Sequence, residues 1–181
     1  MEKIIKRDLK KLAEIARADR ERMFERNENW APYRKRLLCV ALCQGAAQHF
    51  VDAKNGIKDF DVWTFFARSP QRPFPDMALF RRRATADFGP SRFGRTPGAP
   101  KRFEGRRVDL LSRSLDVGPR ADAAAAVRAW LEGGGSESAR KLAEQAVVLI
   151  EPSPGEVIWR ADGAECGRRD SNPHGPKPTR T

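Results

Sequence analysis

The chain has 181 residues, of which 40% are apolar and 33% charged, and its formal net charge is +11. This length fits one globular, charge-rich domain with a real hydrophobic core, and no apolar run approaches the roughly 18 residues that a membrane span needs. The charged N-terminus shows no signal peptide and the three cysteines form no even-numbered disulfide framework, so we expect a cytoplasmic protein with no membrane partner.

The first segment, residues 1–36, is expected to be a long helix followed by a linker. Apolar residues recur at spacings of three, four and seven between residues 2 and 28, which predicts a helix with a charged opposite face. Pro32 interrupts the pattern and marks the linker. These 36 residues carry 12 basic and 7 acidic side chains.

The main domain is expected to span residues 37–160. Short apolar or β-branched runs predict strands at 37–43, 57–66 and 106–115, with a closing strand or hairpin at 147–151 and 156–159. Helices are expected at 45–55, 120–132 and 136–147, the last two separated by three glycines. This order predicts a mixed α/β or α+β domain, with a small mixed sheet and flanking helices.

A long basic loop, residues 67–105, is expected inside this domain, and a loop of that length is usually functional or disordered. Residues 68–107 hold 11 basic and 3 acidic side chains, which favours an anionic partner such as a nucleotide, a polyphosphate or a nucleic acid. Arg92 and Arg95 flank an aromatic, glycine-rich segment, as a phosphate or base contact requires, and Ser91 can bond a phosphate. A basic, solvated surface is the alternative.

The tail, residues 161–181, has no apolar periodicity and is expected to be disordered. The stretch "RRDSNPH" within it can be encoded by codons whose reverse complement resembles the T-arm of a tRNA gene. We therefore hypothesise that the reading frame overruns into a tRNA gene on the opposite strand from about residue 166. The flanking DNA tests this hypothesis, because it requires a tRNA gene at that position.

Three aspartates form the strongest candidate site. Asp59 and Asp61 are one residue apart on a predicted strand, so both project from one face. Two such charges repel each other unless a cation lies between them, and Mg²⁺ prefers their hard oxygen ligands. Asp109 is an isolated charge between apolar neighbours on a later strand, which is costly to bury without a partner. Together the three carboxylates make a site able to hold two ions; solvated strand ends are the alternative.

The stretches "LLCVALCQGAA", "KDFDVW" and "RRVDLL" resemble the signature of the nucleotidyltransferase superfamily, which includes DNA polymerase beta and the minimal nucleotidyltransferases. The family pattern is a strand, a Gly-Ser or Gly-Gly turn opening a helix, a strand bearing D-x-D or D-x-E, and a third acidic residue on a later strand. Gly45 matches the turn glycine, Asp59 and Asp61 match the metal-binding pair, and Asp109 matches the third carboxylate. The resemblance covers about residues 37–113.

This resemblance implies a nucleoside triphosphate such as ATP, two Mg²⁺ ions, and transfer of a nucleotidyl group to a hydroxyl with release of pyrophosphate. Asp59 and Asp61 would bind the metals, and Asp109 would bind the second metal and help to activate the acceptor hydroxyl. Gly45 and Ala46 would open the helix whose N–H groups meet the triphosphate. Ala46 departs from the family's Ser or Gly, so it offers backbone donation without a hydroxyl.

Two other functions remain open at this stage. The chain is alternatively a catalytically inactive nucleotide- or nucleic-acid-binding module on the same fold, or a regulatory partner that docks another protein through its long N-terminal helix. The acceptor would be a small molecule, a protein hydroxyl or a nucleic acid. Nothing in the sequence indicates an oligomeric state.

Overall fold

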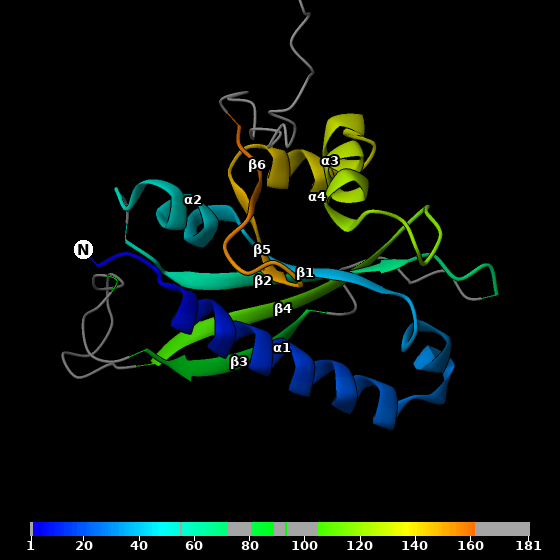
Figure 1. Ribbon diagram of the computed structural model, residues 1–181. Coiled ribbons are helices and arrows are strands. Elements are labelled where there is room, and N and C mark those ends of the chain that lie inside the picture. Colours follow the sequence, from blue (N-terminus) through cyan, green and yellow to red (C-terminus); the bar gives the residue numbers. More distant parts are fainter. Residues whose placement is uncertain (1, 55, 72–80, 89–92, 94–104, 162–181) are drawn as a thin grey trace, which may run out of the picture.

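The computed structural model describes residues 2–54, 56–71, 81–88, 93 and 105–161. Six strands form one mixed sheet in the order β3-β4-β2-β1-β5-β6, and helices flank it (Figure 1). The expected fold class, α+β with a long N-terminal helix, is confirmed. Across the described ranges, no helix is both long enough and apolar enough to span a bilayer.

The strands and helices follow the predicted order with one addition. β2 and β4 are parallel neighbours, whereas the other strand pairs are antiparallel. The strands are β1 Leu37–Cys43, β2 Asp59–Ala67, β3 Arg82–Asp87, β4 Gly105–Leu115, β5 Val147–Glu151 and β6 Val157–Trp159. The helices are α1 Lys6–Arg26, the 3₁₀ helix η1 Glu28–Tyr33, α2 Gln44–Asp52, α3 Ala123–Gly133 and α4 Glu137–Ala143.

The added element is β3, which corrects the expectation of a continuous loop over residues 67–105. β3 pairs antiparallel with β4, from Arg82 opposite Leu110 to Asp87 opposite Gly105, and it forms one edge of the sheet. Its sequence, "RRATAD", lacks the strong apolar alternation of a core strand. Charged side chains are common on edge strands, so an edge strand can resemble a loop in its composition. Ser91, Arg92 and Arg95 lie outside the described residues, as does the tail from residue 162.

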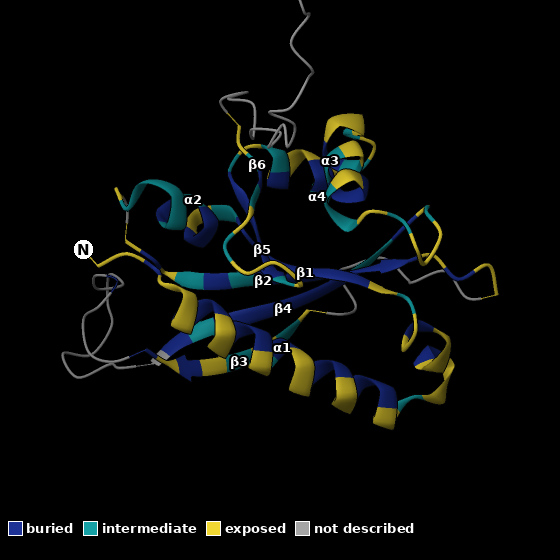
Figure 2. Ribbon diagram, in the orientation of Figure 1, coloured by how far each residue is buried: buried dark blue, intermediate teal, exposed yellow. Residues whose placement is uncertain are grey.

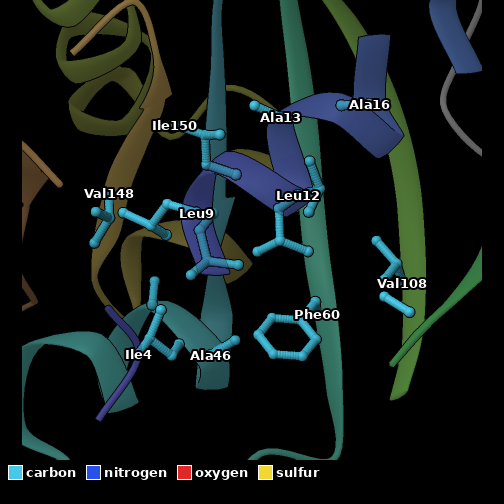
Figure 3. Packing of buried hydrophobic residues seen from close by; sticks show 14 of the residues in the cluster. Ile4, Leu9, Leu12, Ala13, Ala16, Ala46, Phe60, Val108, Val148 and Ile150 are labelled. Carbon is cyan, nitrogen blue, oxygen red and sulfur yellow. The ribbon is translucent and has the colours of Figure 1, made fainter. Parts of the chain in front are cut away.

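One face of the sheet is covered by α1. The exposure pattern along α1 alternates, with buried residues toward the sheet and exposed residues away from it (Figure 2). In Figure 3, Leu9 points toward Val148 and Ile150, while Leu12 points toward Phe60. Both leucines are fully buried, so α1 belongs to the core of the sheet and is not an appended arm.

The opposite face is covered by α3 and α4 (Figure 1). Trp63 and Phe65 of β2 pack here against Trp130 of α3, with ring centroids 6.2 Å and 5.6 Å away. Side chains alternate along a strand, so Asp59 and Asp61 lie on this same face, while Phe60 and Val62 enter the core under α1. The helices cover the middle of this face, and the aspartates lie nearer the beginning of β2.

Ion pairs fix α1 on the sheet from both sides. On the β3 side, Arg82 Nε lies 2.6 Å from Asp19 Oδ2. On the β5 side, Glu151 accepts from Arg17 at 2.6 Å and from Arg20 at 3.1 Å. Because Asp19 and Arg20 are buried, the Arg82–Asp19 and Arg20–Glu151 pairs are better shielded from solvent than ordinary surface pairs.

Candidate active site

The three predicted aspartates meet where β1, β2 and β4 lie side by side. In the parallel pairing of β2 with β4, Asp61 is the direct partner of Asp109, and Asp59 is the partner of Arg107. Asp61 is also opposite Cys43, the last residue of β1. Neighbouring strands lie about 4.8 Å apart, so the fold brings the carboxyl groups of two distant segments onto one small patch.

Asp109 is the most buried of the three. It is 0% exposed, and its Oδ2 accepts a hydrogen bond from Arg81 and lies 3.3 Å from Arg107 Nη2. Its Oδ1 lies 3.5 Å from Arg83 Nε but accepts no hydrogen bond. A fully buried carboxylate is tolerated only with such cations around it, and one of its oxygens still has spare acceptor capacity.

Arg107 bridges two of the carboxylates. Its Nη2 donates to Asp59 Oδ2 and also lies within ion-pair distance of Asp109 Oδ2. A single cationic nitrogen therefore lies between two of the three acids, in the kind of position that a metal ion would take. Arg81 and Arg83 complete the set, so three guanidinium groups balance three carboxylates and the patch is formally neutral.

Asp61 differs from its two neighbours, because among the described residues it forms neither a hydrogen bond nor an ion pair. Burial, together with the negative charges of Asp59 and Asp109, raises the pKa of the Asp61 carboxyl from 3.8 to about 6, against the opposing effect of Arg81 and Arg107. A carboxyl with a pKa raised by burial and like charges is a frequent feature of functional sites. Asp61 is thus the acid in this patch that most lacks a cation.

The arginines were missed by sequence reasoning. Arg81 and Arg83 belong to a basic run, and such runs usually form a solvated surface. Arg107 was not predicted as a site residue, although it lies two residues before Asp109. A signal was nevertheless present, because Arg107 and Asp109 are two residues apart on one strand and so share a face. The partnership of Arg81 and Arg83 with Asp109 depends on β3, which the sequence did not reveal.

The turn from β1 into α2 lies beside Asp61. The helix begins at Gln44, whose φ of 57° is in the left-handed region, a conformation that costs a non-glycine residue about 1–3 kcal/mol. Gly45, the predicted turn glycine, has ordinary backbone, and a Cβ placed on it would meet nothing within 4 Å. Its lack of a side chain is therefore not explained by packing within the described chain, and the space beside it is open.

Ala46 lies with its side chain in the core under α1, at 2% exposure (Figure 3). Because the whole residue is buried and its side chain faces the core, a hydroxyl at this position would not be exposed to a ligand. Gly45 and Ala46 come directly after the strand partner of Asp61. The first turn of α2 and the carboxylate patch are therefore neighbours in the fold.

As the side chains lie, the described ranges contain no group of three His, Cys, Asp or Glu residues arranged to hold a metal ion. Asp59 and Asp109 are instead paired with the guanidinium groups of Arg81 and Arg107. The patch can bind a cation if an arginine moves away, and it can bind a phosphate through the same arginines. No family model matches the chain, and no significant match is found among curated proteins or solved structures.

Proposed function

We propose that the chain binds a nucleoside triphosphate together with Mg²⁺ at Asp59, Asp61 and Asp109, and transfers its nucleotidyl group to a hydroxyl acceptor with release of pyrophosphate. The observation that carries the proposal is the direct pairing of Asp61 with Asp109 across β2 and β4. A half-buried acid with a raised pKa, beside two more acids, is stabilised by an added cation. The succession of strand, turn, helix and acid-bearing strand supports the resemblance to nucleotidyltransferases.

The donor set suits magnesium. All three side chains offer carboxylate oxygens, which Mg²⁺ prefers, and it commonly takes only one or two from the protein. Asp109 Oδ1 accepts no hydrogen bond, and Asp61 forms no ion pair among the described residues. When bound, Mg²⁺ would supply positive charge that stabilises the reacting phosphate and the departing pyrophosphate.

The arginines take part in this proposal as exchangeable partners. The side chains of Arg81 and Arg107 are 44% and 41% exposed, so each can rotate without disturbing the core. Before the nucleotide binds, they neutralise the carboxylates. Bound Mg²⁺ would neutralise the same carboxylates, and the guanidinium groups of Arg81 and Arg107 would then be available to bind phosphate oxygens in a bidentate manner.

The two described cysteines take no part in the proposed chemistry. Cys39 and Cys43 are buried free thiols on β1. Burial raises the pKa of Cys39 to about 12 and also raises that of Cys43. Both thiols therefore remain protonated, unreactive core residues.

The test is a calorimetric titration of the purified chain with ATP, in Mg²⁺ and in EDTA. The wild type should bind ATP in Mg²⁺ and lose most of that affinity in EDTA, and Asp61→Asn should behave in Mg²⁺ as the wild type does in EDTA. Asp116→Asn removes a carboxylate that is 88% exposed, so it is the matched control and should bind normally. The proposal fails if no nucleoside triphosphate binds, or if Asp61→Asn leaves Mg²⁺-dependent binding intact.

A second candidate is metal-independent binding of a nucleotide or nucleic acid. The observation that favours it is the formal neutrality of the patch, in which guanidinium groups already occupy the cation positions. This function predicts affinity that is unchanged by EDTA and falls steeply with salt concentration. The same titration, repeated at two salt concentrations, separates the two candidates.

A further inference from the structure

A groove of about 720 Å³ lies beside α1, against β1 and the end of β5. α1 covers the opposite face of the sheet from the carboxylate patch, so the groove is separate from the candidate active site. Its walls contain apolar side chains from the two strands and the turn after β5, and basic side chains from α1. The residues that line it include Lys6, Lys10, Arg17, Leu37, Ile150 and Glu151.

The groove includes an open strand edge. β5 pairs with β1 only from Val40 to Cys43, because β5 ends at Glu151 and Pro152 follows it. Leu37 and Cys39 therefore pair with β2 on one side and have no described strand on the other. Cys39 is 1% exposed whereas Leu37 is 36% exposed, so Leu37 is the position at which an added strand can reach this edge.

Exposed apolar side chains mark the same region. Among the described residues, the two exposed large hydrophobic side chains are Ile5, at 46%, and Leu37, at 36%. Leu37 lines the groove, and Ile5 directly precedes Lys6, another lining residue. Exposed apolar groups beside an open strand edge are typical of a surface that another chain covers.

The charge of the groove is positive and comes from one stripe of α1. Lys6, Lys10 and Arg17 are four and seven residues apart, so they share a helix face. Arg17 pairs with Glu151, which also pairs with Arg20. Within the part of the chain that the structure describes, Lys6 and Lys10 have no carboxylate partner, whereas Lys11 turns away and donates to the carbonyl of Asp87 beside β3.

We propose that this groove binds an extended acidic segment of a partner protein. The segment pairs with the strand edge at Leu37, places carboxylates against Lys6 and Lys10, and packs an apolar side chain on Leu37. In an extended segment whose apolar and acidic residues alternate, the apolar side chains face one wall of the groove and the carboxylates face the other. A nucleic acid would leave the strand edge unpaired, and a membrane surface is too flat to enter the groove.

The test uses fluorescence anisotropy of a fluorescein-labelled peptide with alternating Val and Glu, and a matched peptide with Lys in place of Glu. Lys10→Glu reverses a charge in the groove. Arg22→Glu makes the same change on an exposed residue of the opposite face of α1, and thus serves as control. We expect the acidic peptide to bind wild type and Arg22→Glu equally, and to bind Lys10→Glu about tenfold more weakly or worse.

Two further measurements identify which class of ligand binds in the groove. N-methylation of alternate peptide bonds should abolish binding, because it removes the N–H groups that pair with the strand edge. Equal binding of the basic peptide, normal binding to Lys10→Glu, or an unaffected N-methylated peptide would each overturn the proposal. Preferential binding of a single-stranded oligonucleotide or of anionic vesicles, lost in Lys10→Glu, would overturn it in favour of those ligands. None of these outcomes depends on ATP binding at the carboxylate patch.

Discussion

Asp61 is the residue on which the proposed chemistry of the patch depends. Its pKa is raised to about 6 in the folded chain, whereas an unfolded aspartate ionises near 3.9. Between these two values the unfolded state binds fewer protons, so the free energy of unfolding falls as pH rises. The ionised side chain is therefore destabilising at neutral pH, as expected for a group that is placed for a ligand rather than for stability.

Replacing Asp61 with Asn should stabilise the chain at pH 8 in the absence of divalent metal. We expect a gain of about 1–3 kcal/mol in the free energy of unfolding, because a shift of about two pKa units corresponds to roughly 3 kcal/mol and partial exposure reduces it. The gain should disappear below about pH 4, where the native carboxyl is also protonated. Urea denaturation at both pH values measures this, with Asp116→Asn as control. An equal gain at pH 4 and pH 8 would contradict the assigned cause.

Arg107 supplies a second prediction at this scale. Arg107→Gln removes the guanidinium that bridges Asp59 and Asp109, which leaves the patch with one uncompensated negative charge. Mg²⁺ alone should then bind about tenfold more tightly, while ATP with Mg²⁺ should bind more weakly, since a phosphate partner is lost. Calorimetry measures both, and the exposed Arg120→Gln should change neither. If the affinity for Mg²⁺ alone and the affinity for ATP with Mg²⁺ both rose or both fell, Arg107 would not be a group that moves from the carboxylates to the phosphates.

Among the elements, α1 contributes most clearly to the core of the sheet. Leu12→Ala should lower the free energy of unfolding by about 2–5 kcal/mol, because a fully buried leucine leaves both a transfer loss and a cavity. Ile5→Ala, at an exposed position before the same helix, should cost less than about 1 kcal/mol. Equilibrium denaturation measures both. Similar losses in the two variants would mean that α1 does not pack on the sheet as described.

The elements also show what sequence patterns can and cannot predict. The runs at 37–43 and 147–151 are continuous and apolar, so both were predicted as strands and both are buried central strands. β3 was missed because an edge strand needs little apolar surface, and its two arginines have the composition of a solvated loop. The parallel pairing of β2 with β4 was also invisible, because pairing partners are set by topology rather than by local pattern.

The candidate site was predicted in part. Strand alternation correctly placed Asp59 and Asp61 on one face, and the fold brings Asp109 beside Asp61. The balancing arginines were not predicted, because Arg81 and Arg83 reach Asp109 only through the β3–β4 pairing. The positive φ in the turn before α2 belongs to Gln44 rather than to Gly45, and the sequence pattern did not indicate this.

At the scale of the whole molecule, one sheet separates two surfaces of different character. α3 and α4 cover one face and α1 covers the other (Figure 1). The first face carries the carboxylate patch at the beginning of β2, and the second carries the basic, apolar groove. β1 joins them, since Cys43 at its end lies opposite Asp61 and Leu37 at its start lines the groove. A partner in the groove would thus contact the same strand that leads into the turn beside the candidate active site.

The central claim is that Asp59, Asp61 and Asp109 hold metal while the arginines turn to phosphate. A crystal structure grown with Mg²⁺ and a non-hydrolysable ATP analogue tests it most directly. The account predicts metal density coordinated by oxygens of these three aspartates, with Arg107 moved from Asp59 onto the phosphates. A structure in which Arg107 still bridges Asp59 and Asp109, with no metal among the three aspartates at saturating Mg²⁺ and nucleotide, would contradict it.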